Sequence, residues 1–506
     1  MRRLSALKCT PLFAAILFGT TASADVTAQQ VWDSWTTQME TYGQGFSTGD
    51  ETMSGDTLTI SDVTIEMSDD EVTVMADVGD IALTENGDGT VNITMADSYP
   101  LTMEFTPQIG DATTLNMTVA QSNMVILVSG DPGALQYDIT ADLYSFTADS
   151  LEGEGAKDVE LGQSALIMRD MAGTYSVTEG DLNEVDYSFD LGALDIDVNI
   201  TEPGGGNSVK AAADLADLSM NAAIAIPADM DMDADVPPFA DGLAMDGGYT
   251  FGDVRYVFDI KGDGEEFAGT AVVESGGMDF GFDFDRVSYS GGAQGIDLSI
   301  SVPQELPFPI DVTMAKYGFD FGMPLSTGEG GPQDARLAFD FTELSVSDGI
   351  WNLFDPAQIL SRDPVTIALG LDLQFTPFFD FLDPAQQEAM IGNDIPGELN
   401  GVEITELTVR GVGAEITGDG AFTFDNTDLT TFDGFPRPQG EVNLAINGVN
   451  ALIDNLIQMG LIPQDQAMMP RMMLGMFATP VGDDMLTSTI GVNAEGHVLA
   501  NGQRLR

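Results

Sequence analysis

Four aspartates at alternate positions, residues 229, 231, 233 and 235, are the best candidates for metal binding in this sequence. Calcium prefers clustered carboxylates, and the first three have the spacing with which an EF-hand loop begins. Alanine stands at the sixth and twelfth positions of that loop, where an EF-hand requires glycine and glutamate. The motif therefore fails, and we expect no metal and no other cofactor. Asp229, Asp231 and Asp233 remain as weak metal candidates, and Asp419, Asp425 and Asp428 form a weaker alternative.

Residues that could support catalysis are few. His497 is the only histidine, so a histidine-based metal site has too few ligands and acid–base catalysis would need another partner. The chain contains no phosphate-binding Gly-x-x-x-x-Gly-Lys-Ser/Thr loop. With 82 acidic residues, carboxylate pairs arise by chance and do not identify a glycosidase-like site. We predict no catalytic residue and no enzymatic activity.

The chain is strongly acidic, with 17 Lys and Arg against 82 Asp and Glu and a net charge of −65. Such a surface repels the phosphates of nucleic acids, which excludes nucleic acid as a partner. Two explanations of the acidic excess stay open. One is a solvated surface suited to a salty exterior, where screening weakens self-repulsion; the other is a set of calcium sites. The solvated surface is the simpler explanation.

The first 24 residues have the order of a secretory signal peptide. A basic start is followed by an apolar run over 12–18 and by the small residues Ala22-Ser23-Ala24. We therefore predict a periplasmic protein that is cleaved after Ala24. The only cysteine, Cys9, lies within this predicted signal, so the mature chain has no disulfide. No later apolar stretch is long enough to predict a transmembrane span after cleavage.

Apolar residues at helical spacing predict one amphipathic helix over 28–42, with Thr27 as its N-cap, and another over 447–459. A methionine-rich segment that contains Pro470 follows the second helix, and methionine adapts to irregular apolar shapes. Core packing is the simpler role for these methionines and for the tryptophans of the first helix. A lipid-like ligand is the alternative, with the candidate contacts Trp32, Trp35, Met469, Met472, Met473 and Met476.

From Leu58 onward the hydrophobic period changes to two, and the pattern returns over 185–200 and 278–300. It predicts strands with one apolar and one polar face, as in antiparallel sheets. Asn86-Gly87-Asp88-Gly89 predicts a hairpin turn between two such strands. We predict a mainly β (α+β) fold, in which long antiparallel sheets form an elongated sandwich or a curved groove. An N-terminal helix and helices in the C-terminal third complete it.

Three regions are expected along the chain. They are the signal peptide over 1–24, a β-rich meander with its N-terminal helix over 25–345, and a strand-plus-helix region with the methionine-rich segment over 346–506. Asp355-Pro356-Ala357-Gln358 and Asp383-Pro384-Ala385-Gln386 predict two helix starts, with Asp as N-cap and Pro at the first helical position. A final hairpin is expected to turn at 493–496.

Several segments carry a family resemblance. They are the signal with its tryptophan-containing first helix, Ile350-Trp351-Asn352-Leu353-Phe354-Asp355-Pro356, Ala414-Glu415-Ile416-Thr417-Gly418-Asp419-Gly420 and Ala500-Asn501-Gly502-Gln503. Together they resemble the bacterial family called domain of unknown function 2125, over nearly all of the mature chain. That resemblance implies an envelope location and no known reaction, so it supplies no catalytic residue. The strands are also distantly similar to AsmA-like envelope proteins, whose long sheets curl into apolar-lined grooves for lipids.

The function expected first is non-enzymatic binding or shielding of a lipid-like apolar ligand by a curved sheet. A closed core is the alternative explanation of the half-apolar strands, because any sandwich buries such faces. The second class of function is an envelope scaffold or interaction module that offers exposed strand edges to a partner.

Overall fold

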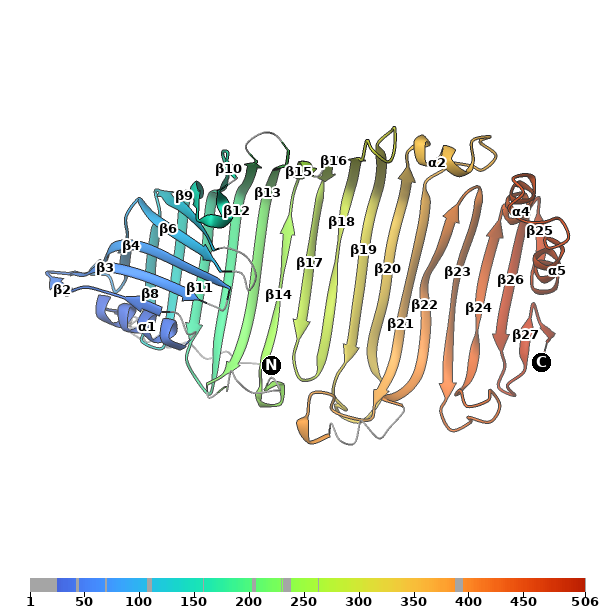
Figure 1. The fold of residues 1–506 in the computed structure, drawn as a ribbon. Helices are drawn as coiled ribbons and strands as arrows, with labels where there is room; N and C mark the ends of the chain where they lie inside the picture. The colour runs from blue at the N-terminus through green and yellow to red at the C-terminus, as the bar shows by residue number, and fades with distance from the viewer. Residues whose placement is uncertain are drawn as a thin grey trace, which may run out of the picture.

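The computed structural model describes residues 25–41, 45–68, 71–106, 112–157, 159–202, 206–228, 230, 238–262, 264–386 and 395–505. The predicted signal peptide and the aspartates at 229, 231, 233 and 235 lie outside these residues. The described strands belong to one antiparallel sheet of 28 strands (Figure 1). Helices accompany it at the N-terminus and in the C-terminal third. The prediction of a mainly β fold is confirmed, and a single long sheet takes the place of a sandwich.

The elements have the following bounds. The helices are α1 (Ala28–Thr41), α2 (Asp348–Phe354), α4 (Val449–Gln458) and α5 (Met468–Phe477), with 3-10 turns η1 (Glu154–Ala156), η2 (Phe239–Asp241) and η3 (Pro384–Gln386). The strands of the first half are β1 (Gly45–Ser47), β2 (Glu51–Ser54), β3 (Thr57–Ser68), β4 (Val72–Glu85), β5 (Val91–Thr94), β6 (Ser98–Phe105), β7 (Thr113–Ser122), β8 (Val125–Asp131), β9 (Ala134–Glu152), β10 (Glu160–Leu161), β11 (Ala165–Thr178), β12 (Leu182–Thr201) and β13 (Ser208–Pro227). Those of the second half are β14 (Ala244–Phe251), β15 (Val254–Gly262), β16 (Glu265–Val273), β17 (Ser275–Phe282), β18 (Arg286–Ser301), β19 (Ile310–Pro324), β20 (Gln333–Val346), β21 (Val365–Pro377), β22 (Gly397–Gly411), β23 (Ala414–Asp425), β24 (Arg437–Asn447), β25 (Thr479–Gly482), β26 (Met485–Val492), β27 (Val498–Ala500) and β28 (Gln503–Arg504).

The sheet is an up-and-down meander. Among the long strands, β11 pairs with β9 and β12, and β12 pairs with β11 and β13. Where two short strands follow one another along one line, as β14 and β15 do, they pair with the two halves of a single long strand, here β13. The sheet also continues past residue 345, because β20 pairs with β21. Local pairing of this kind produces a quasi-one-dimensional array, in which each strand depends mainly on its neighbours.

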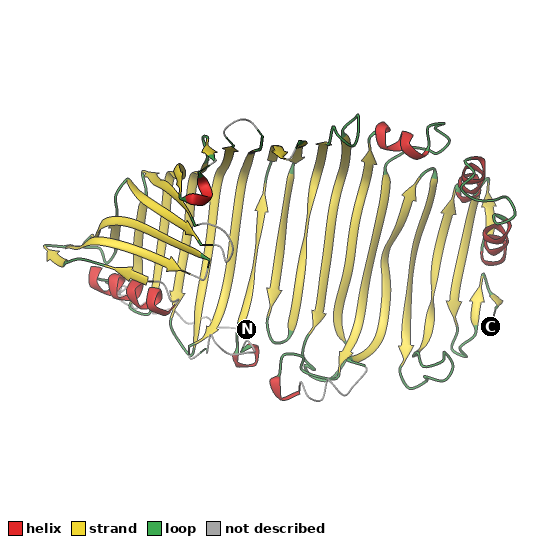
Figure 2. Cartoon of the chain, in the orientation of Figure 1, coloured by secondary structure: helices red, strands yellow, loops and turns green. Residues whose placement is uncertain are grey.

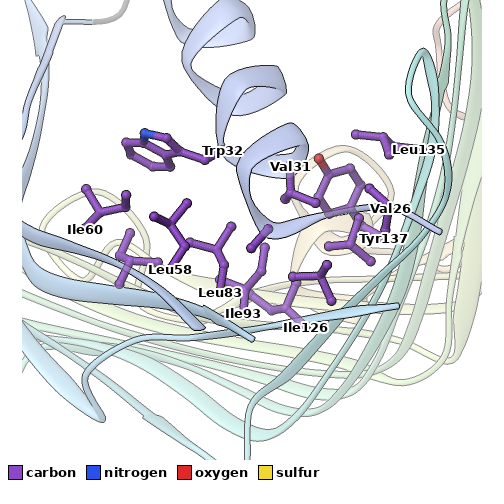
Figure 3. Packing of buried hydrophobic residues seen from close by; sticks show 14 of the residues in the cluster. Val26, Val31, Trp32, Leu58, Ile60, Leu83, Ile93, Ile126, Leu135 and Tyr137 are labelled. Carbon is purple, nitrogen blue, oxygen red and sulfur yellow. The ribbon is translucent and has the colours of Figure 1, made fainter. Parts of the chain in front are cut away.

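Helix α1 packs on one end of this sheet. Thr27 caps it as predicted: the Gln30 amide donates to the Thr27 hydroxyl oxygen at 3.3 Å, and the Gln30 side chain accepts from the Thr27 amide at 3.0 Å. This reciprocal pair is a capping box. Val31 and Trp32 of the helix are buried in a cluster with Leu58, Leu83 and their neighbours (Figure 3). The helix therefore serves as a second layer over β3, β4, β5, β8 and β9.

Many strands change phase near their middle. Asp62 in β3, Asp170 in β11 and Asp217 in β13 have φ of 51°, in the left-handed region that Asp tolerates better than most residues. In β12 the apolar residues fall on odd positions up to Leu191 and on even positions from Leu194. Both residues pack against the same small cluster, so both halves of the strand keep one apolar side. Such irregularities bend strands. Figure 3 shows the sheet curving, so that some strands lie below α1 and others rise beside it.

The C-terminal third agrees only partly with prediction. Helix α4 lies within the predicted range 447–459, and β26 and β27 form the expected final hairpin. The first predicted helix start is wrong, because Asp355 follows α2 instead of beginning a helix. Its buried carboxylate accepts hydrogen bonds from the amides of Ile359 and Leu360, at 3.0 and 2.9 Å. A carboxylate that accepts from backbone amides can cap the start of a helix. At Asp355 it stabilises the turn after α2 instead. At the second site the described residues form the single turn η3.

Candidate functional site

A cavity of about 770 Å³ lies between α1 and the sheet. The helix contributes Trp35 and Met39, and strands from β3 to β13 form the opposite wall. Trp35 stacks on Tyr137 with ring centroids 6.4 Å apart, and Tyr137 contacts Tyr175 with centroids 5.8 Å apart. None of the described residues that line the cavity is charged. A cavity of this size and lining suits a small apolar ligand.

The polar atoms in the cavity wall include two tyrosine hydroxyls that satisfy one another. The hydroxyls of Tyr99 and Tyr144 are 2.7 Å apart. Burial raises the pKa of Tyr99, and the hydrogen bond to Tyr144 raises it further. Burial likewise raises the pKa of Tyr137 to about 12. The phenols of Tyr99, in the cavity wall, and of Tyr137, which stacks on Trp35 beside it, are therefore neutral at physiological pH.

The cavity belongs to a much longer apolar surface. Cross-strand partners project from the same side of a sheet, so the pairing register follows one face from strand to strand. One row of partners crosses from β3 to β24 and contains no charged residue. Its members are Leu58, Leu83, Ile93, Ile126, Ile139, Gly173, Phe189, Met220, Tyr249, Met278, Gly291, Phe319, Phe339, Leu369, Leu407, Gly418 and Leu444. We call the side of the sheet defined by this row the apolar face.

The apolar face is covered at one end and open along its middle. The cavity reaches Phe189 and Met220, which continue the row beyond α1. Figure 2 shows the described helices at the ends and edges of the sheet, with none across its middle. Large side chains on the open stretch are correspondingly exposed, by 37% to 41%: Tyr249, Tyr289, Phe321, Leu337 and Ile367. The open stretch therefore presents a broad apolar surface, of the kind that marks a binding site.

The opposite side of the sheet, the polar face, carries the charge. Ser290 pairs with both Asp279 and Asp320, directly behind the apolar row. Basic residues on this face neutralise some of the acids: Arg169 bonds Asp195 at 2.7 Å, Lys316 bonds Asp340 at 2.8 Å, and Arg336 bonds both Asp320 and Asp372. Strand alternation thus separates the charge of the chain from its apolar face.

The predicted ligand contacts lie at two ends of the molecule. Trp35 lines the cavity. Trp32 is buried in the neighbouring core, where its indole donates to the Glu51 carboxylate at 3.0 Å. Met469, Met472, Met473 and Met476 lie on α5 and are exposed at the far end of the sheet (Figure 1). The structure does not bring the two sets together, and the aromatic residues along the open stretch were not among the predicted contacts.

The described residues hold no group of three or more His, Cys, Asp or Glu that could bind a metal ion. Asp425 and Asp428 both bond Arg437, at 2.7 and 3.3 Å. Hydrogen bonds from the Thr427 hydroxyl and from Arg437 lower the pKa of Asp425 to about 2. Asp419 lies elsewhere, paired with Asn443 in the middle of β23 and β24. Asp425 and Asp428 therefore hold the connection between β23 and β24 through Arg437, and Asp419 is not part of this cluster.

One catalytic spacing escaped the sequence reasoning, because Gly45-Phe46-Ser47-Thr48-Gly49 matches Gly-x-Ser-x-Gly. In hydrolases this motif forms a sharp strand-to-helix turn that exposes the serine. Here Ser47 ends a short strand and pairs with Thr64 of β3. His497, the only histidine, belongs to the hairpin at the opposite end of the sheet (Figure 1). The local geometry required by the motif is therefore not formed.

Within the described chain, no helix is long and apolar enough to cross a membrane. A family model described as an uncharacterized protein conserved in bacteria (DUF2125) matches residues 321–494. This match is narrower than the resemblance over nearly all of the mature chain, since it begins in β19. No curated protein matches the chain. Over residues 321–494, the chain is therefore similar to the DUF2125 family.

Proposed function

We propose that this protein is a non-enzymatic periplasmic protein that binds or shields lipid-like apolar ligands along its apolar face. The observation that carries this proposal is the uninterrupted row from Leu58 to Leu444, which lacks any charged residue in a chain of net charge −65. Exposed apolar surface is unfavourable in water by roughly 25 cal/mol per Å². A surface of this extent is therefore best explained by a ligand that covers it.

The dimensions suit acyl chains. The cavity under α1 has the volume of a site for one small ligand. Strands lie roughly 4.8 Å apart, so the row from Phe189 to Leu444 extends for roughly 50 Å. That length is about three times one leaflet of the roughly 30 Å hydrocarbon core of a bilayer. The open stretch could hold several acyl chains side by side. The cavity under α1 would hold the acyl chain at the N-terminal end of this series.

Exposed strand edges support the second candidate, an envelope scaffold or interaction module, less well. The sheet ends on short strands, since β2 has four residues and β28 has two. Short edge strands offer few unpaired backbone groups and resist the addition of a further strand. The edges thus favour a ligand on the face over a partner at the edge.

A charge placed on the open stretch tests the proposal. Tyr289 pairs with Phe280 and Phe321 on the apolar face, and the adjacent Ser290 pairs with Asp279 and Asp320 on the polar face. Tyr289→Lys should reduce bound lipid in native mass spectrometry, and uptake of a fluorescent fatty acid, by roughly tenfold, because a lysine ammonium must be desolvated beside an acyl chain. Ser290→Lys is the matched control and should leave both unchanged. Equal uptake by the two variants, with both folded by circular dichroism, would reject the proposal.

A further inference from the structure

Helix α5 presents an apolar side to water. At about 100° per residue, Met468, Met469, Met472, Met473 and Met476 share an arc of roughly 140°. All five are exposed, by 49% to 72%. Leu474 and Phe477 lie outside this arc and are half-buried. We call the five residues the methionine arc.

The methionine arc stands at the end of the apolar face. The carbonyl of Phe477, the last residue of α5, accepts a hydrogen bond from the Ser488 hydroxyl at 2.6 Å and from the Asn501 side chain at 2.9 Å. Ser488 is the register partner of Leu444 and is itself buried. Ser488, the partner of the last residue in the apolar row, therefore holds the C-terminal end of α5 beside the end of that row.

The electrostatics restrict what could cover the arc. It contains no charged residue, and the neighbouring Arg471 is bonded to Asp454 at 2.5 Å. A second copy of this chain would bring another 65 negative charges to the contact, and repulsion between like charges opposes that association. Anionic lipid headgroups would be repelled for the same reason. An uncharged apolar occupant that adapts to flexible methionines fits the arc best.

We propose that the methionine arc docks on the surface of a zwitterionic phospholipid bilayer and thereby brings the end of the apolar face to the membrane. This inference rests on the proposed function, because it names the source of the ligand that the face would bind. The side chains enter the boundary between headgroups and acyl chains, as those of interfacial helices do. The rest of the acidic surface stays in water and orients the molecule on the bilayer.

Vesicle flotation tests this docking with the full chain. The double variant Met472→Gln/Met473→Gln should lower binding to phosphatidylcholine vesicles by roughly tenfold, because two apolar side chains become polar at the interface. Met53→Gln/Met75→Gln is the matched control, since these exposed methionines lie at the opposite end of the sheet. It should float like the parent chain. Adding phosphatidylglycerol should weaken binding of the parent chain at low salt, because the acidic surface repels anionic lipid.

The outcomes separate docking from ligand binding. Fatty-acid uptake that persists while the α5 variant loses flotation supports docking by the arc. No flotation of the parent chain, or equal loss in the two double variants, overturns the docking inference and leaves the proposed function standing. Flotation without any lipid uptake contradicts the proposed function alone. A sedimentation shift from dimer to monomer in the α5 variant would assign the arc to self-association and overturn membrane docking.

Discussion

Leu83 and Leu337 face the same side of one sheet in opposite surroundings. Leu83 lies under α1 and is 0% exposed, whereas Leu337, in the open stretch, is 41% exposed. Both belong to alternating strands and pair with apolar residues on either side. The exposures of the two leucines differ because α1 forms a second layer over the N-terminal end of the sheet and does not cover the open stretch. One sequence pattern can thus produce a closed core and an open apolar surface in the same sheet.

The two ends of this comparison imply different sources of stability. At the covered end, burial of apolar side chains supplies the free energy of folding. Along the open stretch the strands are held by their backbone pairing, by ion pairs on the polar face and by polar anchors in the connections. A bound apolar ligand would supply the missing second layer there.

The largest expected effect is a difference between two identical substitutions. Leu83→Ala should lower the local free energy of unfolding by about 2–5 kcal/mol, because it leaves a cavity in a packed core. Leu337→Ala should cost less than about 1 kcal/mol, because that side chain is already partly in water. Hydrogen exchange of the amides in β4 and β20 measures both. Equal losses would show that the open stretch is covered in solution, and would break the comparison.

Asp355 tests how the connections between strands stabilise the open stretch, because it lies between α2 and β21. Burial opposes its carboxylate, but the amides of Ile359 and Leu360 outweigh that effect and lower the pKa of Asp355. A lowered folded-state pKa stabilises the protein above the unfolded-state value of about 3.9, and this contribution is lost as pH falls further. Asp355→Asn should therefore lower the melting temperature at pH 7, with a difference that shrinks below about pH 4. Calorimetry from pH 7 to pH 3 measures this, with the exposed Asp363→Asn as control. A difference in melting temperature that stays constant with pH would show that the variant is destabilised by altered packing or hydrogen bonding and not by the loss of the carboxylate charge.

The smallest effect is expected on the polar face. Arg336 bonds Asp320 and Asp372, and its side chain is 41% exposed. Arg336→Ala should change the free energy of unfolding by less than about 1 kcal/mol, because solvent screens exposed pairs. Added salt should reduce the effect further. Denaturant titrations at low and high salt provide the measurement; a loss that matched Leu83→Ala would mean that ion pairs, and not burial, hold the sheet together.

Periodicity was sufficient to predict most of the fold. The helical spacing after Thr27, the alternation from Leu58 and the turn at residues 86–89 all correspond to α1, β3 and the β4–β5 connection. The change of phase within β12, between Leu191 and Leu194, is also visible in the sequence and marks the bend. The sequence alone does not identify this bend, because the same phase change is equally expected of two strands joined by a turn. The predicted helix start at Asp355 was wrong because an Asp-Pro pair is equally compatible with the turn that follows a helix.

The candidate site was predicted less completely. Trp35 was among the predicted contacts and lines the cavity, but the exposed aromatic residues Tyr249, Tyr289 and Phe321 were not. Alternation places all three on the apolar side of their strands. It does not show whether another layer lies above them. Met472 likewise has the same helical spacing whether its helix faces a core or water.

The sequence by itself determined the strands, the separation of charge from apolar surface and the capped first helix, because these follow from local periodicity and from hydrogen bonds between near neighbours. Only the tertiary structure decided that the strands join into one continuous sheet, that α1 covers one end alone and that the methionines of α5 face water. These features depend on which elements meet across long distances in the chain. Alternation specifies that one side must leave water, but packing decides what covers it.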